Sequence, residues 1–101
     1  MQYGVFSQFT VELDDDDANE NFYWLSESKL EALVCLGQRV MTRAVGLIPD
    51  DALDGVLKAW RLARDTEDIS KGFNIAGVTY YVREVDDAEL VNLNKISLAN
   101  V

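Results

Sequence analysis

A helical pattern across residues 26–65 places the strongest constraint on the fold of this chain. Hydrophobic residues recur at intervals of three and four from Leu30 to Ile48, which is the period of one face of an α-helix. A second segment with the same period follows after a short break. The pattern therefore predicts two amphipathic helices, near 28–46 and 51–65.

The ends of the first predicted helix carry capping signals. Ser28 followed by Glu31 fits a capping box, and Ser26 fits a hydrophobic staple as the alternative start. Gly46 favours a left-handed cap, and Pro49 cannot continue the helix. Because the connection is only four residues long, the two helices are expected to be antiparallel neighbours.

Gly37 lies on the apolar stripe of the first helix, although glycine costs roughly 1 kcal/mol there relative to alanine. Close approach of another chain segment would compensate for this cost. The residues predicted to be buried are Leu33, Gly37, Val40, Val56 and Trp60.

The remaining segments have strand character. Residues 2–13 alternate between apolar and polar positions, and residues 73–75 and 78–85 read as a hairpin with an Ala76-Gly77 tip. Residues 14–25 are predicted to be a connection, within which Phe22, Tyr23 and Trp24 supply either a lid on the core or exposed interface anchors.

The last segment, residues 89–101, is compatible with a short helix or with a fourth strand. We favour the strand because Asn92 and Asn94 are poor residues for a helix interior. The predicted fold is then a single α+β domain, 1–101, in the order β-α-α-β-β-β. It consists of an antiparallel sheet of about four strands with the helical hairpin on one face. Phe6, Thr79 and Tyr81 are expected on the other, partly exposed face.

Composition excludes several classes of function. The net charge of −9 disfavours direct binding to nucleic acid, and the absence of histidine removes the commonest general base and metal ligand. No nucleophile motif or phosphate loop is present, so we expect no enzymatic activity and no cofactor. The chain has no apolar run long enough for a membrane span, and we expect no signal peptide. Its single cysteine, Cys35, suits a reducing cytoplasm.

One weak metal motif is present. Asp15, Asp17 and Asn19 match the first three ligand positions of a calcium-binding loop. The match then fails, because Glu20 stands where that loop needs glycine and Ser26 stands where it needs glutamate. A calcium-binding module is therefore kept only as an alternative, and no metal ligand is assigned.

The acidic residues form three groups that the simplest topology would bring to one end of the fold. The middle group follows the second helix, where the helix dipole disfavours negative charge. We expect an anionic face that docks on a basic partner surface, with Tyr23 and Trp24 as aromatic anchors. The candidate partner-binding residues are Asp14, Asp15, Asp16, Asp17, Glu20, Tyr23, Trp24, Asp65, Glu67, Asp68, Glu84, Asp86, Asp87 and Glu89.

The basic residues offer one unusual pair. Arg39 and Arg43 are an i,i+4 pair of like charges on the first helix and have no carboxylate neighbours in sequence. They are expected to meet a loop carboxylate, or otherwise an acidic patch on a partner.

No family motif is present. As a class, a compact acidic chain of this length is similar to small phage or mobile-element inhibitors, anti-CRISPR proteins among them, that block a basic nucleic-acid-binding surface of host machinery. The first hypothesis is a non-catalytic inhibitor of this kind. The alternative is a structural or assembly protein that self-associates, for example as a homodimer, through Phe6, Tyr81 and one of the residues 22–24.

Overall fold

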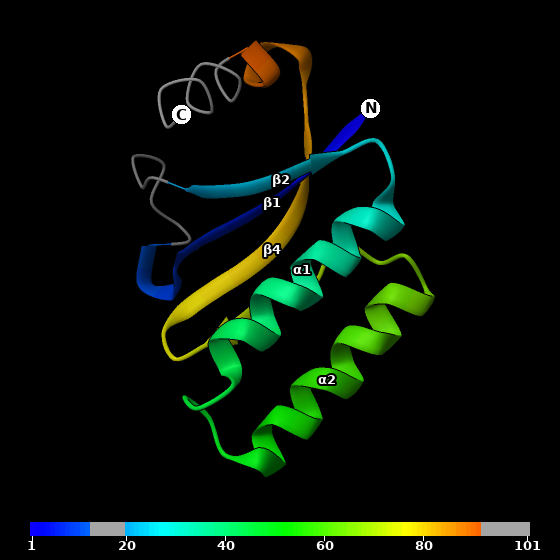
Figure 1. Ribbon diagram of the computed structural model, residues 1–101. Helices are drawn as coiled ribbons and strands as arrows, with labels where there is room; N and C mark the ends of the chain where they lie inside the picture. The colour runs from blue at the N-terminus through cyan, green and yellow to red at the C-terminus, as the bar shows by residue number, and fades with distance from the viewer. Residues whose placement is uncertain (13–19, 92–101) are drawn as a thin grey trace.

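The computed structural model describes residues 1–12 and 20–91. Figure 1 shows two layers, a four-stranded antiparallel sheet and a pair of helices that covers one of its faces. The predicted α+β class and the helical hairpin on one sheet face are confirmed. In chain order the elements are β1 (Gln2–Phe9), the 3-10 turn η1 (Thr10–Glu12), β2 (Asn21–Ser26), α1 (Lys29–Ala44), α2 (Asp50–Asp65), β3 (Phe73–Ile75) and β4 (Val78–Val85).

The helix α1 begins at the capping residue expected from the sequence. The Ser28 hydroxyl accepts the Glu31 backbone N–H at 3.2 Å, and the Ser26 hydroxyl donates to the Glu31 carboxylate at 2.8 Å. At its other end α1 finishes at Ala44 with the extended residue Val45 as cap, and Gly46, the expected cap, adopts a left-handed φ of 84° in the turn that follows. Both serines therefore contribute to the start of α1.

The main core lies between α1 and the sheet. Leu33, Gly37 and Val40 are buried as predicted, whereas Val56 and Trp60 are partly buried against the same core. The Trp60 ring lies over Gly37, and its indole Nε1 donates to the Leu33 carbonyl oxygen at 2.8 Å. The predicted close approach at Gly37 is therefore made by an aromatic side chain of α2.

The strand order across the sheet is β2-β1-β4-β3, with every neighbouring pair antiparallel. The edge strand β2 occupies residues 21–26, which the sequence had assigned to a connection. At the other end of the chain, residues 87–91 form a helical turn rather than part of a strand. The rest of the strand expected over 89–101 lies outside the described residues.

The second face of the sheet has a small core of its own. Phe6 is 1% exposed, so its prediction as an exposed residue was wrong. Its ring packs with Val85, Phe22 and Leu90, the last of which comes from the helical turn after β4. Gly4 makes this possible, because a Cβ atom there would lie 2.4 Å from the Phe6 ring.

The predicted first strand was also too long. It ends at Phe9, and Val11 is 95% exposed in the following turn. Among the described residues, no helix has the length and apolar character needed to cross a membrane.

Candidate functional site

The direction of β4 separates acidic groups that the sequence had placed together. Gln2 lies opposite Val85 in the antiparallel β1–β4 pair, so β4 ends where β1 begins. Asp86 and Asp87 therefore lie at the opposite end of the sheet from the end of β1. The expected topology was wrong on this point, and Asp14, Asp15, Asp16 and Asp17 themselves lie outside the described residues.

Two of the three acidic groups nevertheless share one end of the fold. The Lys29 ammonium at the start of α1 lies 5.7 Å from the centre of the Tyr3 ring, which places this helix end beside the start of β1. Because α2 runs antiparallel to α1, it ends on the same side (Figure 1). We call the following residues the acidic end: Asp65, Glu67, Asp68, Glu84, Asp86 and Asp87.

Local structure accounts for only part of the acidic end. Asp65 pairs with Arg64 at 3.1 Å, and Asp86 accepts the Glu89 backbone N–H at 2.8 Å. Asp68 accepts hydrogen bonds from the Ser70 side chain and backbone, which lower the pKa of its carboxyl group.

The other carboxylates of this end make no such contact. Those of Glu67, Glu84 and Asp87 are exposed and make no hydrogen bond or ion pair with residues 1–12 or 20–91. Their charge is therefore directed to solvent or to a partner.

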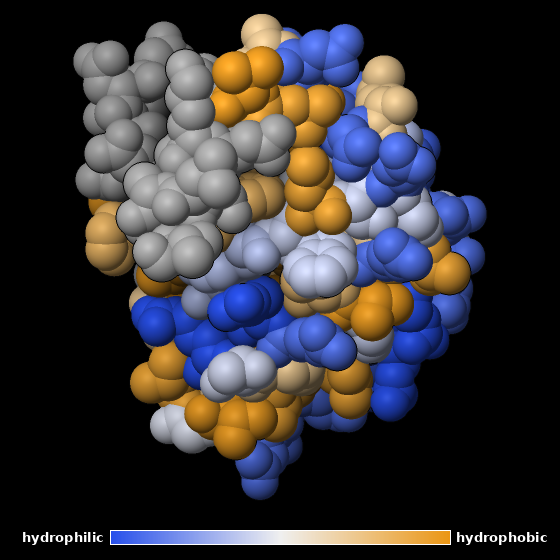
Figure 2. Space-filling model, turned by 45° about the horizontal axis from the view of Figure 1, so that its top comes forward, coloured by the Kyte–Doolittle hydropathy of each residue, from blue (hydrophilic) through white to orange (hydrophobic). Residues whose placement is uncertain are grey.

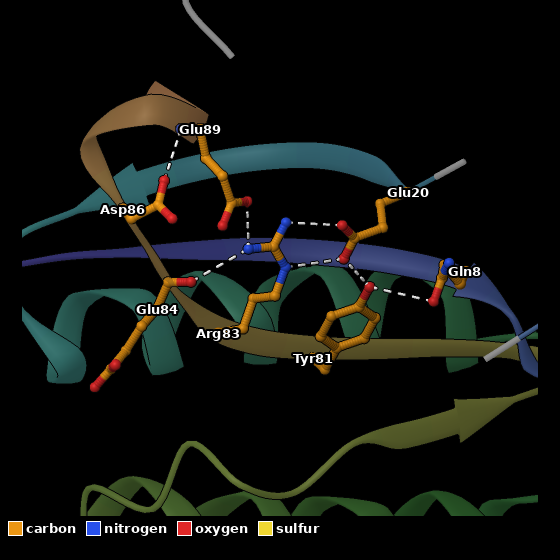
Figure 3. Close-up of polar contacts among 7 residues, drawn as sticks. All are labelled: Gln8, Glu20, Tyr81, Arg83, Glu84, Asp86 and Glu89. Carbon is orange, nitrogen blue, oxygen red and sulfur yellow. Dashed lines mark hydrogen bonds and ion pairs between the residues drawn. The ribbon is translucent and has the colours of Figure 1, made fainter. Parts of the chain in front are cut away.

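Glu20 and Glu89 belong instead to a polar network around Arg83 on the second sheet face (Figure 3). The Arg83 guanidinium binds both carboxylate oxygens of Glu20, with Nε at 3.1 Å and Nη2 at 2.7 Å. Its Nη1 pairs with Glu89 at 2.6 Å. The guanidinium also lies 4.2 Å from the centre of the Phe6 ring, and the Tyr81 hydroxyl donates to Glu20.

The network sets the protonation states of its members. Burial raises the pKa of Glu20, but hydrogen bonds from Arg83 and Tyr81 and the charge of Arg83 outweigh it, so this pKa lies below its usual value. Burial and the Glu20 carboxylate raise the pKa of Tyr81. The ion pairs of Glu20 and Glu89 with Arg83 thus hold two separate segments against β4. Because both carboxylates are paired in this way, we leave them out of the acidic end.

A β-bulge explains how the adjacent aromatics of β2 are arranged. The β1–β2 register shifts between Val5 and Phe6, which leaves one extra residue in β2 at Tyr23. Tyr23 packs on the main core, where its hydroxyl lies 2.6 Å from Ser7 Oγ and its ring stacks on Tyr80. Phe22 packs on the opposite face of the sheet, so the aromatic run serves both cores.

Trp24, by contrast, is 51% exposed. It lines a shallow cleft of about 410 Å³ beside α1, together with Leu30, Val34 and Cys35. Of the residues proposed for self-association, Phe6 is buried and Tyr81 is tied to Glu20, so Trp24 is the one that keeps a large exposed apolar surface. Figure 2 shows hydrophobic residues in separate groups on the displayed face.

Replacing Tyr23 with phenylalanine tests whether its hydroxyl group stabilises the fold. We expect Tyr23→Phe to lower the free energy of unfolding by about 1 kcal/mol, because the buried Ser7 hydroxyl loses its short hydrogen bond. Urea denaturation measures the change. Ser7 keeps a longer contact from the Asn21 amide at 3.4 Å, so a loss above about 3 kcal/mol would contradict this assignment.

The described residues do not assemble a metal centre, and their one cysteine is not set up as a nucleophile. Burial raises the pKa of the Cys35 thiol more than nearby Arg39 lowers it, which disfavours the reactive thiolate. No cluster of three metal-ligating side chains occurs within 1–12 and 20–91. The candidate calcium loop would run from Asp15 to Ser26, yet its second half is the paired strand β2, and Glu20 is held by Arg83.

Comparisons with protein families, with curated proteins and with solved structures find no match for this chain. The Arg83 network was missed by sequence reasoning, because its ion-pair partners Glu20 and Glu89 come from separate segments. One signal was available: Arg83 shares a strand face with Tyr81 and Val85, an apolar setting in which arginine needs partners.

Proposed function

We propose that this chain is a small, non-catalytic binding protein that docks its acidic end on a basic surface of a partner protein. The partner surface would be one that otherwise binds nucleic acid, and the chain would act as an inhibitor by occupying it. Phage and mobile-element inhibitors of the anti-CRISPR kind are the class of protein with this mode of action. The observation that carries the proposal is the placement of Asp65 and Glu67 at the C-terminal end of α2, on the same side of the fold as the exposed carboxylates at the end of β4 and after it.

This placement is unfavourable for the isolated protein. The C-terminal end of a helix carries partial negative charge, so each carboxylate there costs about 0.3–1 kcal/mol. The carboxylates of Glu67, Glu84 and Asp87 gain no compensating ion pair among the described residues. Lysine and arginine side chains of a partner would offset this unfavourable electrostatic energy and steer association.

A nucleic-acid-binding surface is the partner chemistry that fits best. Such surfaces concentrate lysine and arginine to bind phosphates. With 18 acidic against 9 basic residues, this chain is repelled by nucleic acid and attracted to the surfaces that hold it.

The test compares two variants with the same change in charge. One carries Asp65→Asn, Glu67→Gln and Asp87→Asn in the acidic end, and the control carries Asp50→Asn, Asp51→Asn and Asp54→Asn at the start of α2. Each immobilised protein is incubated with a bacterial lysate, and captured proteins are identified by mass spectrometry.

We expect the wild-type protein and the control to capture a nucleic-acid-binding protein that the acidic-end variant retains weakly. A short DNA duplex should displace the captured protein, and retention should fall between about 50 and 300 mM salt, because exposed charges are screened. Capture that is indifferent to DNA, to salt and to the acidic-end substitutions would contradict the proposal.

A further inference from the structure

A pocket of about 380 Å³ lies on the far side of the fold from the acidic end. Arg43 donates from its Nε to the Ile75 carbonyl oxygen at 3.3 Å, and Ile75 pairs with Val78, which lies opposite Phe9 at the end of β1. We call this the arginine pocket, and its lining residues are Tyr23, Arg39, Thr42, Arg43, Val45, Leu47 and Tyr80.

The two arginines of this pocket are held in position without a carboxylate partner among the described residues. The Arg39 guanidinium lies 4.6 Å from the centre of the Tyr23 ring, and the Nε bond to Ile75 orients Arg43. The Nε bond leaves the two terminal guanidinium nitrogens of Arg43 without a hydrogen-bond partner among the described residues, and the Arg39 guanidinium also lies near the Cys35 thiol. Among the other described cations, Lys58, Arg64 and Arg83 form ion pairs, whereas Lys29, Arg61 and Lys71 do not.

Helix stability does not explain the pair. Arg43 lies in the last turn of α1, where a cation is favourable, but its Nε binds a carbonyl of β3 rather than the end of its own helix. Arg39 lies one turn earlier and repels Arg43 as an i,i+4 neighbour. An anion bound between the two guanidinium groups would remove this repulsion.

The geometry points to a binding site for a phosphate monoester in the arginine pocket. Paired guanidinium groups match the oxygens of a phosphate, and the pocket volume falls in the usual range for small ligands. Val45 and Leu47 are 67% and 54% exposed at the rim, where they would contact an apolar or aromatic body attached to the phosphate. The ligand class is therefore a phosphate ester with an apolar group, and this site is independent of the acidic end.

The net charge of −9 does not oppose such a site. Charges on the protein surface are screened over about 8 Å at physiological ionic strength, so the distant carboxylates of the acidic end add little to the field in the pocket. The acidic end lies at the opposite end of the sheet.

The test titrates the 101-residue chain with phenyl phosphate, glucose 6-phosphate and inorganic phosphate, and follows amide chemical shifts by NMR. Phenyl phosphate should bind saturably with a dissociation constant of about 1 mM or lower. It should bind more tightly than the other two compounds, because it alone carries an apolar body. Arg39→Gln and Arg43→Gln should each weaken its binding by at least about tenfold. Arg61→Gln, an exposed arginine on α2, is the matched control and should change the affinity less than about twofold.

Absence of saturable binding at up to about 10 mM phenyl phosphate would overturn the proposal. The same result is expected if another segment of the chain occupies the pocket, and it would overturn the proposal equally. An equal loss of affinity in the Arg61→Gln control would show that the loss follows from net charge alone, and would also overturn the proposal. Equal affinity for phenyl phosphate and glucose 6-phosphate would overturn the assigned role of Val45 and Leu47.

Discussion

Gly37→Leu is expected to lower the free energy of unfolding by about 3 kcal/mol, since a larger side chain overpacks the contact between the helices. A Cβ atom at position 37 would lie 2.2 Å from the Trp60 ring, so the ring must move. Moving it also breaks the hydrogen bond from Trp60 Nε1 to the Leu33 carbonyl oxygen. Thermal unfolding should show a decrease of roughly 15 °C in melting temperature.

The glycine in the second helix provides a matched control. Gly55 also lies inside a 16-residue helix, but a Cβ atom there would have no neighbour within 4 Å. We expect Gly55→Leu to raise the free energy of unfolding by up to about 0.8 kcal/mol, because leucine is the better helix former. The same substitution is thus expected to change the free energy of unfolding in opposite directions in the two helices. Destabilisation of similar size at both positions would show that the Gly37–Trp60 contact is not the cause.

Arg83→Met is expected to lower the free energy of unfolding by about 2 kcal/mol at neutral pH, because it leaves the carboxylate of Glu20 partly buried and without its cation. The Glu20 side chain is 27% exposed and would keep the Tyr81 hydroxyl as hydrogen-bond donor. Arg64→Met is the control. The Arg64 guanidinium also lies over an aromatic ring, that of Trp60, and forms an ion pair with Asp65. Because this ion pair is on the surface, we expect Arg64→Met to lower the free energy of unfolding by less than about 1 kcal/mol.

The effect of Arg83→Met should depend on pH. In the wild-type fold the pKa of Glu20 is lowered from 4.5, so its ionised form contributes stability above that value. This contribution is lost as the pH falls through the folded-state pKa. In the variant, burial without the arginine raises the pKa of Glu20, and protonation then favours the folded state.

The difference between the two proteins should therefore shrink below about pH 4.5. Urea denaturation at pH 7 and at pH 4 measures it. A constant difference at both pH values would place the stabilising role of Arg83 in its packing on Phe6 rather than in its bond to Glu20.

Local sequence signals predicted the helical hairpin. Ser28, Gly46 and the apolar period of α1 act over a few residues, so their meaning does not depend on distant segments. The start of α2 at Asp50, just after the predicted break, has the same local origin. Gly37 was recognised as a point of close approach because its helix position made it costly without compensation.

Most of the candidate site depended on distant segments. The acidic residues at the end of β4 and just after it were assigned to the wrong end of the fold, because composition does not reveal which strand pairs with β1 or in which direction. Arg39 and Arg43 stood out in the sequence as an unpaired like-charge couple, but their pocket is completed by Tyr80 and Tyr23 from two different strands.

The sequence by itself determined the α+β class, the two helices and the excess of negative charge, all of which follow from local periodicity, capping and composition. Only the tertiary structure decided the edge strand β2, the burial of Phe6 and the partners of Arg83. The physical reason is that strand pairing joins residues far apart in the chain. A single bulge at Tyr23 or a turn that brings Leu90 over the second sheet face then changes which side chains are buried.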